Sequence, residues 1–568
     1  MKRFASGALG VPALAAAGIV AGVVATTAQS MGPSTLQSSY VQPALPTVST
    51  MSVLSVGDTV SGYRMAGIPD GLGAFDNGDG TFTLLMNHEL GATSGAIHAH
   101  GSKGAFVSKW VIDKDSLKVM SGQDLMKEIY PWDAATQQSV ATPGTFAFTR
   151  FCSGDLPDVT AFYNPATGRG TQARIYMHGE EGGNTGYQLG SVATGPDAGK
   201  TYVLGKFNLS TNGSGLTGIG AWENALASPY PQDKTIVIAN SDGGTGIQTN
   251  AVAVYVGTKK ANGSEVDKAG LTNGTLSFVN VTGNPAEIVD LATRATTIVS
   301  GTRFTLSSTT STTFSRPEDG AWSRSNPNQY YFVTTDQLDQ ATDGVGAQNG
   351  RSRLWRLTFD DIKRPEKGGK IDLLVNGRIV DGERVNMFDN VTLNPGSGLL
   401  VLVEDVGGAA HNGKVWLYDP KTGELTKVGH HDVSRFGDVG IAATAPFNQD
   451  EEASGILDVS SILGAGSYLL VDQSHYLINA ANPRGFTDPD DLVEGGQLLY
   501  MRLPFPIATA KSQCKDGGWE WVFREDGDGF KTLAECNRYV GNDRRGRTNG
   551  AGNDEPEDDA SGQGKDKN

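Results

Sequence analysis

Six short apolar runs in this 568-residue chain end in side chains that bind metal ions or exchange protons. They occupy residues 84–89, 175–181, 236–242, 331–336, 399–405 and 468–475. Carboxylate and imidazole groups are the common protein ligands of hard and borderline cations. Continuous apolar runs of this length are typical of strands buried on both faces. The pattern therefore predicts several buried strands that each carry a potential ligand to one end.

The tetrapeptide Arg316-Pro317-Glu318-Asp319 combines an anion-binding group with a metal-binding group. The planar guanidinium of Arg316 can bind two phosphate oxygens at once. Pro317 restricts the backbone between Arg316 and Glu318. We interpret the turn as a hydrogen-bond donor for an anion beside a metal-binding acid; the alternative is a surface salt bridge.

Three other segments carry candidate ligands. Cys152 lies between Arg150 and Asp155, and its thiolate is a soft ligand for iron or zinc; the alternative is a buried apolar filler. Glu180 and Glu181 are adjacent carboxylates, which repel each other when buried unless a cation lies between them; the alternative is a solvated pair.

Residues 87–89 offer asparagine, histidine and glutamate in a row, with Glu89 and Asn87 on one strand face. The alternative for this tripeptide is a polar strand end. The segments 76–80 and 526–529 resemble calcium loops but lack the acid at position twelve, so we expect hairpin turns there. The sequence contains no serine-hydrolase elbow, Walker loop or zincin motif, which argues against those three classes.

Repetition of these strand ends predicts the fold. The chain has 75 glycines and only 19% charged residues, a composition that suits short strands joined by tight turns. Similar strands that each present an acid at one end favour radial repetition, with the acids converging on a central channel. Residues 252–256, 354–357 and 415–418 look like outer strands. We expect an all-β propeller of about six blades with long loop insertions; the alternative is a β-sandwich.

The formal net charge of −16 limits the partners. Such an acidic surface repels nucleic acid and anionic lipid, so neither is expected. It also repels anionic substrates, and a phosphate ester therefore requires bound cations. We expect a small-molecule substrate and a monomer.

The ends of the chain indicate export. Residues 1–28 have the basic start, apolar run and small-residue end of a signal peptide, by the Sec or twin-arginine route. A retained anchor is disfavoured because the run is short and broken by glycine. We expect a secreted or periplasmic protein, in which Cys514 and Cys536 pair as a disulfide. The predicted divisions are a linker at 29–50, a propeller at 51–506, a small cysteine-paired module at 511–540 and a disordered tail at 541–568.

The ordered set of segments resembles the PhoX-type alkaline phosphatase family over about residues 55–505. The matching segments are 85–89, that around Cys152, 180–181, 315–320, 350–355, 388–392, 404–405 and 466–475. The resemblance implies a propeller that binds ferric iron (Fe3+) and calcium (Ca2+) and hydrolyses phosphomonoesters. It implies an iron-binding thiolate at Cys152, a bridging carboxylate at Glu180 or Glu181, phosphate bound by Arg316 and metal bound by Glu318. Further metal ligands are implied at Glu89, Asp242, Asn390, Glu404 and Asp405.

The sequence also departs from the family. The Gly-Gly-x-Thr-Pro-Trp-Gly stretch expected after the cysteine is absent, and no second basic residue for phosphate can be matched. Two alternatives to an alkaline phosphatase therefore stay open. One is a calcium-dependent propeller lactonase or esterase, which would not need Cys152. The other is a catalytically silent metal-binding surface protein.

Overall fold

The computed structural model describes residues 30–546 except 184, 217–219, 244–249, 291–292, 337–351, 378, 381, 506, 509, 516–518, 520–521 and 525–528. The predicted signal peptide, most of the calcium-loop-like segment 526–529 and residues 547–568 lie outside the described part. No helix within that part is long and apolar enough to cross a membrane.

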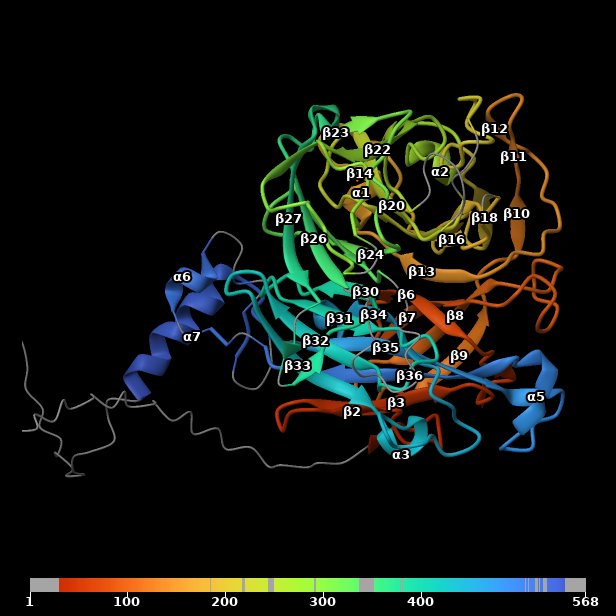
Figure 1. Ribbon diagram of the computed structural model, residues 1–568, viewed down its shortest axis with the longest axis vertical. Coiled ribbons are helices and arrows are strands. Elements are labelled where there is room, and N and C mark those ends of the chain that lie inside the picture. Colours follow the sequence, from red (N-terminus) through yellow and green to blue (C-terminus); the bar gives the residue numbers. More distant parts are fainter. Residues whose placement is uncertain are drawn as a thin grey trace, which may run out of the picture.

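Six antiparallel blades surround one axis (Figure 1). The innermost strands of neighbouring blades contact one another in the cyclic order β6, β13, β19, β24, β30, β34 and back to β6. This closed ring confirms the prediction of an all-β propeller of about six blades.

The first three blades follow one another along the chain. Blade one contains β6 (Pro69–Asp76), β7 (Thr81–His88), β8 (Phe106–Asp113) and β9 (Val119–Asp124). Blade two contains β13 (Phe151–Asp155), β16 (Ile175–Glu180), β17 (Gln188–Val192) and β18 (Lys200–Val203), with β10 (Glu128–Tyr130) parallel to β18. Blade three contains β19 (Trp222–Ala227), β20 (Lys234–Ser241), β21 (Val252–Thr258) and β22 (Thr275–Val281).

The other three blades complete the ring. Blade four contains β24 (Pro317–Trp322), β25 (Gln329–Thr334), β26 (Arg353–Phe359) and β27 (Gly369–Asn376). Blade five contains β30 (Phe388–Leu393), β31 (Leu400–Glu404), β32 (Lys414–Asp419) and β33 (Glu424–His431). Blade six contains β34 (Glu451–Asp458), β35 (Ser467–Leu477), β36 (Glu494–Arg502) and, from the N-terminal side of the chain, β3 (Ser49–Ser55). Outside the blades, β23 (Thr302–Ser307) pairs with both β22 and β27 and so joins blades three and four.

Short elements occupy the loops between these strands. The two-stranded sheets are β4 (Thr59–Val60) with β5 (Tyr63–Arg64), β11 (Trp132–Asp133) with β12 (Gln138–Ser139), β14 (Tyr163–Asn164) with β15 (Arg169–Gly170), and β28 (Ile379–Val380) with β29 (Glu383–Arg384). The helical turns are α1 (Val159–Phe162), α2 (Glu265–Lys268), η1 (Pro365–Lys367), α3 (Val433–Phe436), α4 (Ser460–Leu463), α5 (Ile478–Ala481) and η2 (Pro489–Asp491).

The apolar core lies between the blades. Six clusters of buried side chains each join two neighbouring blades, and large residues such as Trp110, Trp222, Trp355 and Trp416 are fully buried in them. This packing explains why the second strands are apolar on both faces: each face meets another blade. Near the axis the inner strands approach so closely that a Cβ on Gly71 would lie 2.2 Å from the backbone nitrogen of Gly154. Glycine is therefore required at this point.

The predicted linker at 29–50 is wrong for the described residues 30–50. They contain β1 (Ser30–Met31), parallel to β3, and β2 (Val41–Pro43), antiparallel to β33. Val41 is fully buried because it packs between blades five and six. Since β3 is the outer strand of blade six, the two ends of the propeller chain close the ring together.

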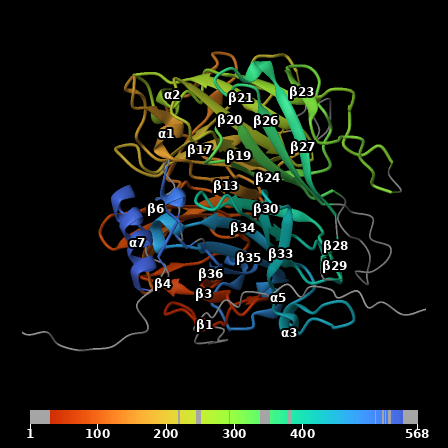
Figure 2. The same cartoon turned by 90° about the vertical axis from the view of Figure 1, so that its left-hand side faces the viewer.

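A small C-terminal module lies outside the propeller (Figures 1 and 2). It includes α6 (Lys511–Cys514) and α7 (Leu533–Gly546), and the predicted disulfide between Cys514 and Cys536 is confirmed. Both cysteines belong to the module's own apolar cluster. The disordered tail predicted from 541 is corrected at its start, because α7 continues to Gly546.

Candidate metal site at the mouth of the central channel

A ring of potential ligands surrounds one end of the channel. The second residue of every inner strand is acidic or a cysteine, and all six line a single cavity: Asp70, Cys152, Glu223, Glu318, Asp389 and Glu452. Equivalent backbone positions in six blades are related by the pseudo-symmetry of the propeller. The ring thus follows from the repetition of one strand position.

A backbone irregularity marks this position in each blade. The pairing of every inner strand with the next strand of its blade shifts register close to the ring residue. A β-bulge of this kind turns a side chain away from its regular direction and is common beside active sites. Here it allows a ligand-type side chain to face the channel on a strand that otherwise packs against neighbouring blades.

The cavity is about 620 Å³ in volume and strongly acidic. Ten carboxylates line it: those of the ring, those of Glu89, Glu181, Asp242 and Asp405 from the ends of the second strands, and that of Asp450. Only Arg150, Arg316 and His475 supply basic groups among the described lining residues. Such an excess of carboxylates in a partly enclosed space favours the binding of cations.

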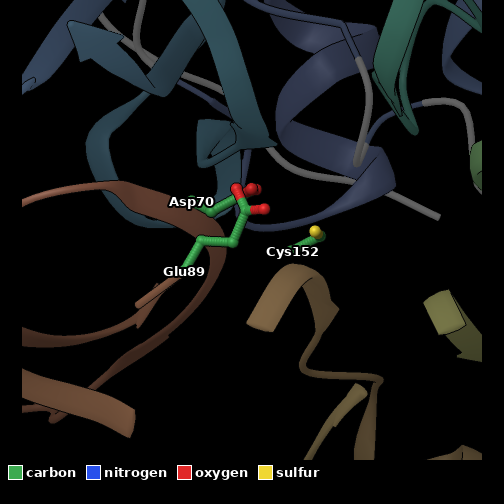
Figure 3. Close-up of side chains that lie close together, drawn as sticks. All are labelled: Asp70, Glu89 and Cys152. Carbon is green, nitrogen blue, oxygen red and sulfur yellow. The ribbon is translucent and has the colours of Figure 1, made fainter. Parts of the chain in front are cut away.

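Two groups of side chains have the spacing of a metal site. One consists of Asp70, Glu89 and Cys152, which converge in Figure 3, and the other of Glu223, Glu318 and Asp389. Within each group, the ligand atoms lie within 4.8 Å of one another. The buried carboxylates can therefore hold a metal ion.

In the first group, one ligand atom has no hydrogen bond. Oδ1 of Asp70 is buried without a partner, whereas Oδ2 accepts a hydrogen bond from Gln473 Nε2 at 2.9 Å. The same amide donates to Glu89 Oε2 at 3.1 Å, and Cys152 Sγ lies 3.3 Å from Oε2 of Glu181. Gln473 thus orients two carboxylates toward one point, and the bare oxygen of Asp70 remains available to a cation.

Each member of the second group accepts a hydrogen bond from a neutral donor, and Glu318 also contacts the guanidinium of Arg316. Glu318 Oε1 accepts a hydrogen bond from Thr335 Oγ1 at 2.7 Å, and Asp389 Oδ2 accepts one from Asn390 Nδ2 at 2.6 Å. Glu223 accepts a hydrogen bond from the hydroxyl of Ser153. These contacts leave further lone pairs on each carboxylate.

Burial and mutual repulsion shift the titration of these groups. Burial, and then the neighbouring carboxylates, raise the pKa of Asp70, Glu223 and Asp389 well above the usual range. The pKa of Glu452 rises to about 7 for the same reasons, and burial raises that of the Cys152 thiol. A bound cation stabilises the anionic forms and opposes these shifts.

Three basic side chains face the acids. Arg150 Nη2 lies 2.9 Å from Glu89 Oε1 and also contacts Glu181. Arg316 Nη2 lies 2.8 Å from Asp242 Oδ2 and 3.2 Å from Glu318 Oε1. Nδ1 of His475 lies 2.7 Å from Oε2 of Glu494, and its Nε2 lies 3.3 Å from Oε2 of Glu452.

Seven of the residues predicted from sequence meet at this cavity. They are Glu89, Cys152, Glu181, Asp242, Arg316, Glu318 and Asp405. Their assigned roles as metal or phosphate ligands stay predictions.

The other three predicted ligands lie elsewhere. Both carboxylate oxygens of Glu180 accept backbone hydrogen bonds, from Thr149 and Tyr187. Those of Glu404 accept bonds from backbone nitrogens and from Trp416 Nε1 at 2.8 Å. Asn390 lines a separate cavity of about 200 Å³. The loop and strand contacts of Glu180 and Glu404 explain their burial without a metal.

The recurrent apolar runs are second strands of their blades, not innermost strands. Residues 84–88 belong to β7 and 236–241 to β20, and the strands expected to be outer are third in their blades. Two acids carried by these runs bind other partners and do not line the cavity. Asp336 forms an ion pair with Arg294, and Oδ2 of Asp472 lies 2.8 Å from Nε2 of His431.

Sequence reasoning missed Asp70, Glu223 and Glu452 and chose Asn390 in place of its neighbour Asp389. Glycine and polar residues interrupt the inner strands, so these strands lack a continuous apolar run. A spacing signal exists: Asp70 precedes Glu89 by 19 positions, and Glu223 precedes Asp242 by the same number. Each such pair spans one hairpin whose two ends meet at the channel.

Comparisons with known proteins give only distant similarities. No protein-family model and no curated protein matches the chain. A luciferin-regenerating enzyme is 8% identical, with 80% of this chain and 95% of that chain covered and a TM-score of 0.37. A candidate 6-phosphogluconolactonase from Bacteroides uniformis is 11% identical, with 77% of this chain and 85% of that chain covered and a TM-score of 0.31. A thermostable family-43 glycoside hydrolase is 11% identical, with 66% of this chain and 95% of that chain covered and a TM-score of 0.31. Similarity at this level carries no argument about activity.

Proposed function

We propose that this chain is a secreted, metal-dependent hydrolase that cleaves phosphate monoesters at the mouth of its channel. The observation that carries the proposal is the ring of five carboxylates and one thiol at equivalent positions of six inner strands. A purely structural role does not explain ligand-type residues at all six positions, because buried carboxylates that converge without a cation repel one another and lower stability. Their shared orientation is explained by cation binding.

The donor atoms differ between the two groups. Cys152 gives the first group a soft donor beside Asp70 and Glu89, a set that suits iron or zinc. The second group offers only carboxylate oxygens, which suit calcium. Both donor sets are compatible with the iron and calcium that the family resemblance implies.

Substrate binding is assigned to the arginines at the rim. Bound cations would neutralise the substrate's charge and polarise its phosphorus–oxygen bonds. Arg316 would bind anionic phosphoryl oxygens with its planar fork. The family resemblance left the second basic residue for phosphate unmatched in the sequence. We assign this role to Arg150. His475 lines the same cavity and contacts Glu452 and Glu494, and in this proposal it would hold a proton for the leaving oxygen.

The test is turnover by full-length secreted protein loaded with iron and calcium. We expect hydrolysis of an aryl phosphate at alkaline pH, and its loss after chelation. Folded protein with both metals bound but no phosphatase turnover would refute the proposal. Elemental analysis of the same sample identifies the metals.

A second candidate is a calcium-dependent lactone or ester hydrolase. The oxygen-only group Glu223, Glu318 and Asp389 favours it, because such a site needs no thiolate. It predicts hydrolysis of an aryl ester or lactone that persists in Cys152→Ala, whereas the phosphatase loses activity. Metal binding without turnover of either substrate class would instead indicate the catalytically silent alternative.

A further inference from the structure

Arg150 and Arg316 occupy equivalent positions in blades two and four. Each lies two residues before the ring residue of its blade, Cys152 or Glu318. Each has a left-handed backbone, with φ of 47° and 57°. Ile68 and Met387 have the same conformation at this position in blades one and five, so the turn is a repeated feature of the propeller. Arginine is not needed to form the turn, and its placement at the cavity therefore calls for another explanation.

Each guanidinium binds one member of a candidate cation group. Arg150 contacts Glu89 of the first group, and Arg316 contacts Glu318 of the second. Both also bind a second cavity carboxylate, Glu181 for Arg150 and Asp242 for Arg316. The two arginines thus place their positive charges beside carboxylates of the two candidate cation groups.

Neither arginine uses all its hydrogen-bonding capacity. Nη1 of Arg316 is buried and makes no hydrogen bond, while its Nε and Nη2 bind Asp242. The side chain of Arg150 is 52% exposed at the rim of the cavity. Both guanidiniums therefore retain donors for a ligand in the cavity. The arginines come from blades on either side of blade three.

We infer that Arg150 and Arg316 couple cation binding to anion binding. Cations compete with the guanidiniums for Glu89 and Glu318, and the guanidiniums released by cations bind an oxyanion in the cavity. The inference rests on the proposed cation site, but not on any catalytic step. Binding is consequently ordered: cations first, and then the anion.

Two physical effects support this order. A guanidinium close to a ligand oxygen repels an incoming cation, so removing the arginine strengthens cation binding. An oxyanion is repelled by ten carboxylates until cations neutralise them, so it binds poorly without cations. Linkage requires the two effects to be reciprocal: the anion must tighten cation binding by the same factor.

Calorimetric titration of the full-length, chelator-treated protein tests the inference. Calcium is titrated into the wild type, Arg150→Ala and Arg316→Ala; inorganic phosphate, below the solubility limit of its calcium salt, is titrated with and without calcium. We expect wild-type phosphate binding to tighten by about tenfold or more with calcium, within the usual range of coupling between sites. Each alanine variant should bind calcium about three- to tenfold more tightly and phosphate more weakly.

Two further variants separate charge from shape. Arg150→Lys and Arg316→Lys keep the charge but lose the fork, so calcium affinity should resemble the wild type while phosphate affinity falls. Arg303→Ala removes a guanidinium from an exposed pair with Asp360 outside the cavity and should change neither affinity.

Three results would overturn the inference: unchanged or weaker calcium binding in both alanine variants, equal phosphate affinity with and without calcium, or an equal effect of Arg303→Ala. A protein that shows the coupling without turnover would retain this inference and refute only the proposed activity.

Discussion

Cys152 distinguishes the two candidate cation groups at the level of single residues. Its thiol lies with Asp70 and Glu89, whereas the other group contains only oxygen donors. Burial raises the pKa of the thiol, and the surrounding carboxylates raise it further, so the neutral thiol is favoured until a metal displaces the proton. The identity of the first metal therefore depends on this one side chain.

We predict that Cys152→Ser loses a thiophilic metal but keeps calcium. Serine preserves the size of the side chain and removes the soft donor. Elemental analysis of wild type and variant should show iron or zinc falling at least about tenfold, as for loss of a metal-site partner, with calcium little changed. Equal loss of all metals would show that the two groups act as one site.

His431 provides a separate test of buried charge. Its Nε2 lies 2.8 Å from Asp472 Oδ2, and both side chains are buried. Burial lowers the pKa of His431, but the contact with Asp472 and the charges of Asp472 and Glu451 outweigh it, so the pKa lies above its usual value. The stabilisation is therefore complete below the unfolded pKa of about 6.5 and is lost as the pH rises through the folded value.

We predict that the free energy of unfolding falls more steeply above pH 6.5 in the wild type than in His431→Asn. The difference in slope should approach about 1.4 kcal/mol per pH unit, the contribution of one proton. Denaturant titrations from pH 6 to 9 measure it. Parallel curves for the two proteins would show that the ion pair of His431 and Asp472 does not contribute to the pH dependence of stability.

At the level of elements, blade six depends on a strand distant in sequence. β3 pairs with β36 from Ser49 opposite Arg502 to Ser55 opposite Gln497. Leu54 on this strand is fully buried in the cluster between blades six and one. Closure of the ring therefore requires residues that composition alone places in or beside a linker.

Leu54→Ala should destabilise the propeller by about 2–5 kcal/mol, because a buried leucine is replaced by a cavity. Met31→Ala in β1 is the matched control: its side chain is 57% exposed, and a change within about 0.5 kcal/mol is expected. The midpoints of chemical unfolding compare the two. If Leu54→Ala were as stable as the control, β3 would not contribute to closure.

For the whole molecule, the acidic cavity couples metal content to stability. Ten carboxylates converge in a chain whose formal net charge is already −16. Any cation that binds only the folded ring stabilises the fold by mass action, by about 2.7 kcal/mol at a hundredfold excess over its dissociation constant. The ring thus opposes folding without cations and favours it with them.

We predict that a chelator lowers the melting temperature at pH 8 and that added calcium restores it. Sodium chloride at the same ionic strength should not substitute, because screening acts weakly on buried charges. At pH 5 the effect should shrink, since carboxyl groups with raised pKa values then carry protons. Thermal unfolding monitored by fluorescence provides the comparison, and a melting temperature independent of calcium at pH 8 would contradict it.

The sequence by itself determined the architecture and part of the site. Apolar second strands, frequent glycine and repeated terminal acids were sufficient to predict a propeller, because periodic burial is a local property of strands. The late cysteines were sufficient for the disulfide. Cys152, Arg316 and Glu318 could be chosen because their side-chain chemistry is distinctive.

Only the tertiary structure decided which carboxylates share the cavity. Glu180 and Glu181 are adjacent, yet only Glu181 faces the channel, because backbone groups of a neighbouring loop bind Glu180. Asp389 faces the candidate metal group while Asn390 lines another cavity, a choice made by the bulge in β30. Such orientations depend on register shifts and on ring closure between strands far apart in sequence, and no local pattern contains them.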